Sequence, residues 1–359
     1  MQATLTTSAL DKALRTIQRL APTENVRFHC EDGALLRLES STRPASMRIT
    51  LPTEELSGTC DFAISVDAFA KAIKGSDSVT LNYDTAASAL EIKSGTTSIK
   101  LQSVDANPAE LLPMPKDRAV KLGGDDARWL LDAIKRVSLK PTAALVNSTV
   151  YAAVSMSDKN TRVCCFDTSR TAFTATREVT GDLNVMLPVA HLQSAFEAME
   201  GTKFALAVDD SCMYLASPTV LANISLPVPP DGLPEISQLM KLVGTFAASK
   251  DSASTIEVDR DACVSFMDKC QAVATKERQE LRVTLAKGNC RLEVKSAAGQ
   301  ARTTFKAEGS AKFRIDMNYL QEAMSKNDSN EISVTENYIV LRGDTNVVVA
   351  LNEDDGDDK

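Results

Sequence analysis

Three segments of the chain share one pattern of apolar positions. They run from Ile64 to Ile73, from Leu187 to Phe196 and from Ile315 to Met324, and they align without gaps. Apolar residues stand at the first, sixth, ninth and tenth positions of each segment, a spacing typical of an amphipathic helix. The second segment begins 123 residues after the first, and the third begins 128 residues after the second, in a chain of 359. We therefore expect three similar domains.

Alternating apolar and polar residues follow each of these helices. Such alternation predicts antiparallel strands that place one face on a core and the other in water. Three short strands are expected after each helix, with hairpin turns at residues 210–211 and 343–344. The expected strands are residues 79–83, 90–92 and 98–101, then 204–208, 213–215 and 220–226, and finally 332–334, 339–341 and 347–351.

Each third also opens with a helix of its own. Apolar residues at helical spacing mark these helices at 10–21, 130–137 and 263–273, and Ser8 is the expected N-cap of the first. Strands such as 34–38 and 282–285 follow them. Each third then holds two half-units of helix plus antiparallel strands, which makes six in the chain. The expected fold class is α+β, built from three repeated domains.

Proline and glycine interrupt this pattern near residues 113–123 and 229–250, as expected of domain boundaries. We therefore place the domains at residues 1–118, 119–240 and 241–352. Residues 353–359 carry five acids and one lysine. That composition is typical of a disordered acidic tail.

The charge balance narrows the function classes. The chain has 48 acids and 40 Lys and Arg residues, a net charge of −8, which argues against a surface that is basic all over. Eight cysteines without a Cys-x-x-Cys pair predict buried thiols in a reducing compartment. The sequence shows neither an 18-residue apolar run nor a signal peptide. We expect a cytoplasmic protein.

The basic residues of the opening helices recur on one stripe. In the first helix Lys12, Arg15 and Arg19 are spaced i, i+3, i+7, on the face away from the apolar stripe. An ordinary solvated face would explain any single helix. The basic stripe recurs on all three opening helices, which favours a positive surface that contacts phosphates without reading bases. The candidate DNA contacts are Lys12, Arg15, Arg19, Lys71, Lys74, Arg128, Lys135, Arg136, Lys140, Lys269, Lys276 and Arg278.

Residues that would support enzyme chemistry are few. The two histidines, His29 and His191, are not in a metal-ligand spacing. The Gly-x-Ser-x-Gly, Gly-x-Gly-x-x-Gly and P-loop patterns are absent from the sequence. Cys164 and Cys165 would face opposite sides of a strand, so we expect at least one of them in the core. We expect no catalytic residue, metal or cofactor. An enzyme with a carboxylate-based site is one alternative.

Three stretches carry a resemblance to a known family. They are Ser98 to Pro113, Phe166 to Ala172 and Phe313 to Leu351, set in the threefold repeat of about 120 residues. With these features the chain resembles the bacterial-type DNA polymerase sliding clamp, the β clamp, in a divergent bacterial or viral form. The resemblance covers essentially the whole chain and rests on repeat architecture more than on any one motif.

This resemblance implies a head-to-tail homodimer whose six domains close a ring around duplex DNA. The helices would line the hole and the sheets would lie outside. The ring would tether the replicative DNA polymerase for processive synthesis, without preference for DNA sequence. An ATP-driven clamp loader would open it. No cofactor and no membrane would be involved, and the ring would act in the cytoplasm of a bacterial cell or of an infected host cell.

The resemblance also implies a pocket for short hydrophobic peptide motifs of partner proteins, between the second and third domains. Arg170 stands at the family's arginine position, and we expect it at an exposed strand end. The family has Gly-His where this chain has Thr168-Ser169, and Leu where it has Thr171. Asn352 and the acidic tail replace the family's Pro-Met-Arg-Leu-like ending. The expected pocket residues are Val150, Tyr151, Phe166, Thr168, Ser169, Arg170, Thr171, Val347, Val349 and Leu351.

A second class of function stays open from the sequence. A β-rich scaffold or interaction protein that is not a clamp would carry the same repeat. Retention on circular but not on linear DNA distinguishes a clamp from such a scaffold and from an enzyme.

Overall fold

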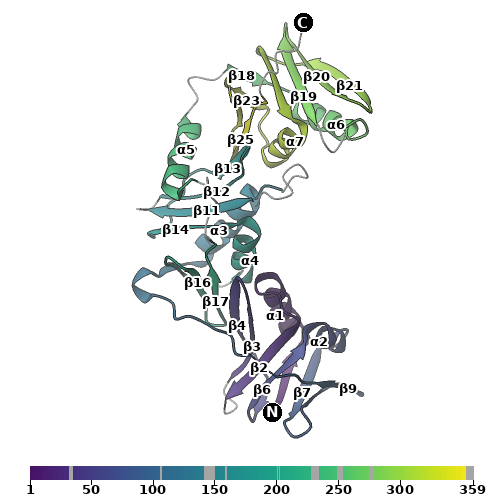
Figure 1. Cartoon of the computed structure of the whole chain (residues 1–359), viewed down its shortest axis with the longest axis vertical. Helices are drawn as coiled ribbons and strands as arrows, with labels where there is room; N and C mark the ends of the chain where they lie inside the picture. Colours follow the sequence, from purple (N-terminus) through teal and green to yellow (C-terminus); the bar gives the residue numbers. More distant parts are fainter. Residues whose placement is uncertain are drawn as a thin grey trace. The chain divides into compact units, whose positions relative to one another are not determined.

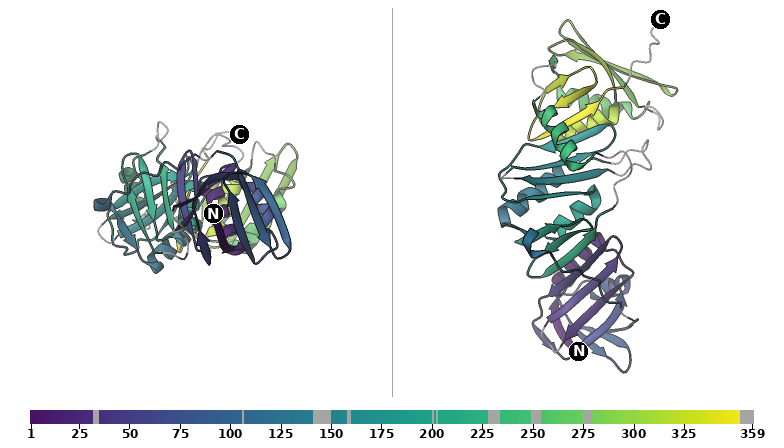
Figure 2. Two further views of the ribbon diagram at one scale, coloured as in Figure 1. Left: turned by 90° about the horizontal axis from the view of Figure 1, so that it is seen from below. Right: turned by 60° about the vertical axis from the view of Figure 1, so that its left-hand side comes forward.

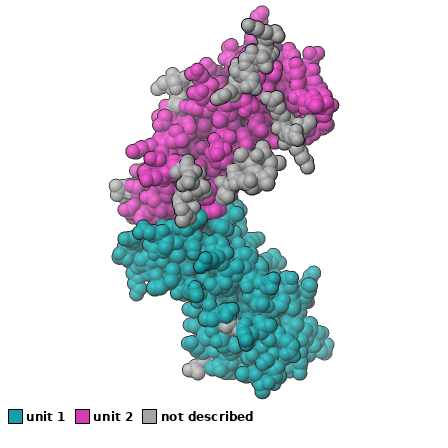
Figure 3. All heavy atoms as spheres, in the orientation of Figure 1, with its two compact units in different colours: residues 1–131, 190–228 teal, residues 132–189, 229–359 magenta. Residues whose placement is uncertain are grey.

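The computed structural model describes most of the chain. The described residues are 1–31, 35–105, 107–140, 150–157, 160–199, 201, 203–227, 234–248, 254–274 and 279–352. The expected acidic tail at 353–359 lies outside them, as do the candidate contacts Lys276 and Arg278. The chain divides into two compact units, which Figure 3 shows in two colours: unit 1 holds residues 1–131 and 190–228, and unit 2 holds residues 132–189 and 229–359.

The first third of the chain contains two strand–helix–strand half-units, both in unit 1 (Figure 1). Each half-unit begins with a strand and a helix and continues with three main strands. The first half-unit consists of β1 (Gln2–Thr6), α1 (Thr7–Leu20), β2 (Asn25–Glu31), β3 (Leu35–Thr42) and β4 (Ala45–Leu51). The second consists of β6 (Cys60–Ser65), α2 (Val66–Ile73), β7 (Ser78–Asp84), β8 (Ala89–Ser94) and β9 (Thr97–Gln102), and the short β5 (Glu55–Ser57) lies between the two.

The middle third repeats this order and contributes to both units. Its first half-unit consists of β10 (Val120–Leu122), α3 (Gly124–Val137), β11 (Tyr151–Ser157), β12 (Asn160–Phe166) and β13 (Arg170–Thr174), with the 3-10 turn η1 (Lys116–Arg118) before it. Its second consists of β14 (Leu183–Pro188), α4 (Val189–Ala198), β15 (Phe204–Val208), β16 (Cys212–Ala216) and β17 (Val220–Ser225).

The last third, all in unit 2, repeats the order once more after an additional helix, α5 (Ile236–Ala248). Its first half-unit consists of β18 (Ser254–Glu257), α6 (Arg260–Cys270), β19 (Glu280–Ala286), β20 (Asn289–Ser296) and β21 (Gly299–Lys306). Its second consists of β22 (Ala311–Asp316), α7 (Met317–Lys326), β23 (Glu331–Val334), β24 (Tyr338–Leu341) and β25 (Thr345–Ala350).

The predicted repeat is confirmed. Helices α2, α4 and α7 begin at Val66, Val189 and Met317, which keeps the offsets of 123 and 128 residues read from the sequence. The α+β fold class is confirmed as well. The domain bounds at 118 and 240 remain predictions, because the two units divide the chain at other positions.

Two sequence predictions about helices need correction. Ser8 does not cap α1: the helix begins at Thr7, and Thr6 precedes it without a capping hydrogen bond from its side chain. Helix α5 was not predicted, because its sequence falls within the segment 229–250 that we assigned to a boundary. Leu239 and Val243 of α5 are nonetheless fully buried, so the helix is part of the core of unit 2.

The leading strand of each half-unit joins the sheet of the other half-unit in the same third. Strand β1 pairs with β7 and β6 pairs with β2; β10 pairs with β15 and β14 with β11; β18 pairs with β23 and β22 with β19. This exchange interlocks the two half-units of every third. It is the physical reason that the repeating element is a pair of half-units rather than one.

Sheets also continue from one third of the chain into the next. Strand β4 pairs with β17, with Ile49 opposite Val220, and β13 pairs with β25, with Thr171 opposite Val348. Two eight-stranded sheets result, β10-β15-β16-β17-β4-β3-β2-β6 in unit 1 and β14-β11-β12-β13-β25-β24-β23-β18 in unit 2. Their strands run side by side in Figures 1 and 2.

Among the described residues, the two remaining sheets end in strands with one neighbour each. In the order β5-β1-β7-β8-β9 the last strand is β9, and in the order β21-β20-β19-β22 the first is β21. No residue of β9 or β21 is buried, whereas every residue of β13 is. Both edges are therefore sites where a further strand could pair.

The core of each unit lies between sheets and helices. On α1 the buried side chains are Leu10, Ala13, Leu14, Ile17 and Leu20, which form the apolar stripe predicted from the sequence. All eight cysteines are buried and unpaired, as predicted. Within the described residues, no helix is both long and apolar enough to cross a lipid bilayer.

Candidate functional site

The candidate DNA contacts that the structure describes all lie at the protein surface. On α1 the side chains of Lys12, Arg15 and Arg19 are exposed, opposite the buried stripe. Arg15 forms an ion pair with Asp11 (2.7 Å) and Arg19 forms one with Glu197 of α4 (3.0 Å). The side chains of Arg15 and Arg19 keep 71% and 61% of their surface exposed, so both guanidinium groups remain accessible to an external anion.

The second helix of the first domain extends this basic surface. Lys71 of α2 and Lys74, which directly follows this helix, are exposed and line one cavity of about 580 Å³ together with Arg15 of α1. The carboxylates of Asp11 and Asp67 line the same cavity. The structure therefore brings cations from both helices of this domain together, with acids among them.

The other candidates in the described residues lie on α3 and α6, except Lys140, which follows α3. Exposed positions are occupied by Arg128, Lys135, Arg136, Lys140 and Lys269. The backbone at Arg136 and Lys140 is fixed by α7: Lys326 Nζ donates to the Arg136 carbonyl (3.2 Å), and the Lys140 N–H donates to Glu322 (2.8 Å). Burial lowers the pKa of Lys326 from its usual range, although Glu322 opposes this shift.

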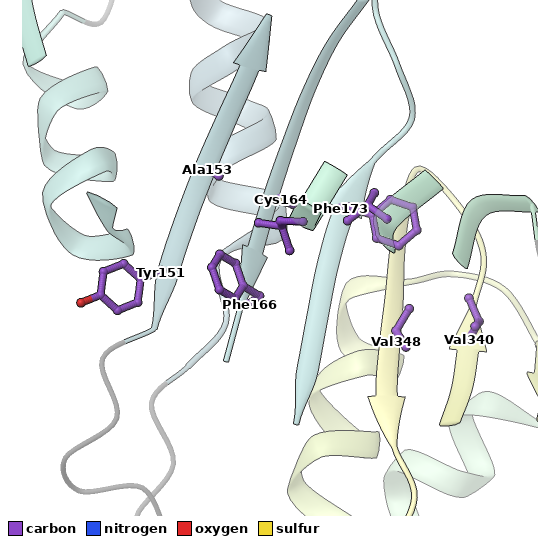
Figure 4. Close-up of a cluster of buried hydrophobic side chains, with 9 residues drawn as sticks. Tyr151, Ala153, Cys164, Phe166, Phe173, Val340 and Val348 are labelled. Atoms are coloured by element: carbon purple, nitrogen blue, oxygen red, sulfur yellow. The ribbon is translucent and has the colours of Figure 1, made fainter. Parts of the chain in front are cut away.

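A second candidate site is an apolar cluster on one face of the large sheet of unit 2. Tyr151 and Phe166 pair across β11 and β12, Phe166 pairs with Thr171 of β13, and Thr171 pairs with Val348 of β25. Residues directly opposite in antiparallel strands share a face, and Figure 4 shows Tyr151, Phe166 and Val348 among the side chains on that face. The buried members of this apolar cluster are Tyr151, Ala153, Cys164, Phe166, Phe173, Leu239, Val243, Val340 and Val348.

Helix α5 covers this cluster only in part. Leu239 and Val243 are buried in it, whereas Met240, Phe246 and Tyr338 are half-buried against it. The rings of Phe246 and Tyr338 meet edge to face with centroids 5.0 Å apart. Leu242, one turn before Phe246 on α5, keeps 45% of its surface exposed. The cluster thus ends in a rim of accessible apolar side chains.

The predicted pocket residues separate onto different surfaces. Tyr151, Phe166 and Thr171 belong to the face of the apolar cluster. Val347 and Val349 alternate with Val348, so they lie on the opposite face of β25. Of the others, Val150 is buried, Thr168 is exposed, Ser169 is half-buried and Leu351 lines a different cavity.

The prediction that Arg170 lies at an exposed strand end is wrong. Its neighbour Thr171 faces the apolar cluster, so Arg170 points to the other side of the sheet, where only 2% of the residue is exposed. Its guanidinium binds Asp167 (Nε to Oδ2, 2.9 Å), Glu322 of α7 and the Lys140 carbonyl (2.9 Å). The ring of Tyr319 lies 4.3 Å from the guanidinium carbon. Arg170 therefore links β13 to α7 inside unit 2 and does not line the apolar cluster.

The turn before β13 determines this orientation. Asp167 Oδ1 accepts hydrogen bonds from the N–H groups of Ser169 and Arg170, both at 2.8 Å. This turn starts the strand at Arg170 and leaves the other oxygen of Asp167 facing the guanidinium. The sequence placed these residues in a turn but carried no signal for Glu322, which is 152 residues away.

The thiols at Cys164 and Cys165 are both fully buried. Burial raises the pKa of the Cys164 thiol far above its usual range and raises the pKa of the Cys165 thiol to about 12. Both therefore stay protonated at neutral pH, a form that is a poor nucleophile. They serve as core side chains, which extends the prediction that at least one would.

Known proteins resemble this chain in fold rather than in sequence. No protein-family description matches the sequence, and no curated protein sequence matches it. The fold of the DNA polymerase III beta subunit of Thermotoga maritima matches 98% of this chain and 99% of its own, with a TM-score of 0.80 at 15% identity. The chain has the β sliding-clamp fold.

Two further clamp structures agree. A DnaN sliding clamp from Bartonella birtlesii, bound to griselimycin, matches 98% of this chain and 99% of its own with a TM-score of 0.77 at 17% identity. A beta clamp from Helicobacter pylori, bound to a DNA ligase peptide, matches 98% of this chain and all of its own with a TM-score of 0.74 at 15% identity. The clamp fold is thus retained in a sequence that shares few residues with these clamps.

Proposed function

We propose that this protein is a DNA sliding clamp: two copies close head to tail into a ring around duplex DNA and tether the replicative polymerase. The clamp fold over nearly the whole chain supports this proposal. The exposed cations on α1, α2, α3 and α6 are side chains of the kind that bind phosphate without reading bases. An ATP-driven clamp loader would open the ring in the cytoplasm.

The observation that carries the proposal is the repeated junction between thirds. At each junction, two strands pair that are each the last of their half-unit. One closes the first half-unit of a third, and the other closes the second half-unit of the following third. The pairs are β4 with β17 and β13 with β25. Strand β21 closes the first half-unit of the last third, and β9 closes the second half-unit of the first third. Both are edge strands among the described residues. Pairing β21 of one copy with β9 of another would continue the pattern. Two such junctions close a ring of six domains.

The same proposal accounts for the exposure of these two edges. Third strands at the internal junctions bury their apolar side chains, for example Val220, Ala222 and Ile224 of β17. In β9, the corresponding apolar residues Ile99 and Leu101 are only half-buried. A partner strand would complete their burial, which favours association.

We propose further that partner proteins bind at the rim of the apolar cluster on α5. The Helicobacter pylori clamp binds a DNA ligase peptide, and this chain offers the half-buried Met240 and Phe246 and the exposed Leu242 for an apolar anchor. Arg170 takes no direct part, because it lies on the other face of the sheet. Such contacts are expected to be micromolar, since one small apolar anchor must offset the ordering of the peptide.

The test of clamp function is retention on DNA by topology. The protein is loaded onto nicked circular duplex DNA by its loader or by subunit exchange at micromolar concentration. The mixture is then separated by gel filtration in high salt. A clamp elutes with the circle and is released once a restriction enzyme linearises the DNA. Release from circular and linear DNA at the same salt concentration would favour the scaffold alternative and contradict the proposal.

A further inference from the structure

The outer face of the sheet β21-β20-β19-β22 carries a dense group of cations. On β19, Leu281, Val283 and Leu285 are buried, so Arg282 and Thr284 point away from the core. The strand registers place several rows of side chains across this outward face, and the row that contains Glu280 and Asp316 is acidic. Two neighbouring rows carry most of the cations. One row is Lys312, Thr284, Arg291 and Thr304, and the other is Arg314, Arg282, Glu293 and Arg302.

These two rows hold five cations and one acid, in a chain whose net charge is −8. We name them the basic sheet face. It lies on the side of the sheet opposite the buried residues, and none of its members is among the candidate DNA contacts on the helices. The proposed clamp function therefore leaves it without a role.

A cavity of about 790 Å³ opens on the basic sheet face. Arg282, Arg291, Lys312 and Arg314 line it, and the loop of residues 335–337 forms one wall. The segment after β25 forms another wall, where the Asn352 N–H donates to the Arg314 carbonyl (3.0 Å). The cavity has the dimensions of a small-ligand or short-peptide site rather than those of a duplex.

Two carboxylates interrupt the positive charge of this cavity. Glu293 accepts from Arg291 (2.8 Å), and Glu336 lines the wall. Arg282 binds Glu280 more loosely, at 3.4 Å. The side chains of Arg291 and Arg282 keep 49% and 36% of their surface exposed, and those of Glu293 and Glu280 keep 12% and 18%. Ion pairs whose cation is exposed in this way contribute little stability. An incoming carboxylate could therefore replace them at small cost.

The chemistry of the cavity favours a peptide over a nucleic acid. None of the outward positions on these four strands is aromatic, so single-stranded bases would find no stacking surface. Glu293 and Glu336 would repel a continuous phosphate backbone. A peptide can place separated carboxylates on the cations and neutral groups beside the two acids. The half-buried Leu351 in the lining offers contact for one apolar side chain.

We infer that the basic sheet face is a docking surface for an acidic peptide segment of a partner protein. The charge complementarity of four lining cations, with an apolar contact at Leu351, defines that segment as several Asp or Glu residues around one apolar residue. The surface is separate from the apolar cluster on α5, so the two could hold different partners at the same time. It does not depend on clamp function.

The test uses the whole protein and the labelled peptide Asp-Ser-Leu-Asp-Ser-Asp, whose carboxylates are separated by neutral residues, with Asn-Ser-Leu-Asn-Ser-Asn as the matched neutral peptide. Residues 353–359, which follow Asn352 in sequence, carry five acids of their own. Every measurement is therefore repeated with those acids replaced by Asn or Gln. This removes intrachain competition as a reason for weak binding.

Fluorescence anisotropy at low salt should show micromolar binding of the acidic peptide and at least tenfold weaker binding of the neutral one. Arg291→Glu with Lys312→Glu should weaken acidic-peptide binding at least tenfold. Both residues are exposed, so the fold should persist, and Arg291→Gln with Lys312→Gln serves if it does not. The control Lys12→Glu with Lys71→Glu, on helices α1 and α2 of unit 1, should leave the peptide affinity unchanged.

Three results would overturn the inference. One is equal affinity for the acidic and neutral peptides. Another is full affinity after charge reversal at Arg291 and Lys312. The third is displacement of the peptide by a thymidine oligonucleotide at a lower concentration than by unlabelled peptide, which would identify a nucleic-acid surface instead.

Discussion

Arg170 forms the most buried ion pairs of the described residues in unit 2, and the stability of that unit should depend on it. Its side chain and that of Asp167 are each 1% exposed, and that of Glu322 is 9% exposed. Removing the cation leaves two buried carboxylates without a charged partner. Arg170→Met should therefore lower the free energy of unfolding by about 3–5 kcal/mol, measured by urea denaturation.

The matched control for this prediction is Arg302→Met on the exposed side of β21, which should change stability by less than about 0.5 kcal/mol. A decrease below about 1 kcal/mol for Arg170→Met would show that the buried network contributes little to stability.

Glu39 of β3 gives the stability of unit 1 a defined pH dependence. Burial would raise its pKa, but hydrogen bonds from Arg48 (2.5 Å) and Arg27 (2.6 Å) outweigh burial and hold the pKa below its usual value. The folded state thus protonates Glu39 at lower pH than the unfolded state does. Its contribution is complete above the unfolded pKa of about 4.3 and is lost as pH falls through the folded value.

Glu39→Gln should consequently destabilise the protein by about 3 kcal/mol at pH 7. Urea denaturation from pH 8 down to pH 3 should show a constant gap between the two proteins to about pH 5 and a narrowing gap below about pH 4. A gap that stays constant to pH 3, or widens there, would contradict the assignment of this pH dependence to Glu39.

At the scale of elements, the exposed stripes of the opening helices should carry DNA affinity. Replacing Lys12, Arg15, Lys135 and Arg136 with Ala should weaken duplex binding about tenfold or more at low salt, equally for different sequences. For each phosphate that the variant no longer neutralises, the slope of log affinity against log salt should fall by about 0.9. Both quantities come from a titration of duplex DNA at several salt concentrations.

The control for DNA binding is Lys93→Ala with Lys100→Ala on the outer strands β8 and β9, where both side chains are exposed. Duplex affinity should be unchanged in this variant. If the control variant weakens DNA binding as much as the helix variant does, DNA affinity depends on the total positive charge of the protein. The helices would then not be the DNA-binding surface.

Helix α5 should control peptide binding through its exposed apolar residue. Leu242→Asp should weaken binding of an apolar peptide carrying Leu-Phe at least tenfold, because a carboxylate at the rim would have to lose water for the peptide to bind. Thr245→Asp, also exposed on α5, is the matched control. Undiminished binding by Leu242→Asp would place the partner site elsewhere.

Periodicity along the sequence predicted the elements because it reports local burial. The offsets between α2, α4 and α7, and the strands that follow each, were all readable in this way. The sequence predicted less reliably which face of a strand each side chain lies on. On β25, the predicted wall residues Val347 and Val349 lie on the side opposite the apolar cluster, and Val348 faces the cluster. Consecutive apolar residues such as these three valines do not distinguish the two faces of a strand.

Long-range pairing was beyond the sequence for a physical reason. The contact between Arg170 and Glu322 and the junction of β13 with β25 join residues far apart in the chain, and no local pattern encodes such partners. Helix α5 had a readable apolar spacing at Leu239, Val243 and Phe246. The neighbouring prolines and glycine led us to assign that segment to a boundary instead.

At the scale of the whole molecule, closure of the proposed ring depends on the open edges of β9 and β21. Ser103 N–H donates to the Ser88 carbonyl (2.9 Å), and bonded and non-bonded pairs alternate along antiparallel strands. The N–H of Lys100 therefore points away from β8, toward the position of a partner strand. Lys100→Pro removes that donor while leaving the hydrogen bonds between β8 and β9 in place.

Light scattering during gel filtration measures the mass of the protein in solution, which tests most directly whether two copies associate. At micromolar concentration the protein should have twice the mass of the 38.7 kDa chain. Lys100→Pro should shift it toward the monomer, and Lys100→Ala, which keeps the N–H, should remain a dimer. A monomeric parent protein, a stable trimer, or a dimer that tolerates Lys100→Pro unchanged would contradict a ring closed through β9 and β21.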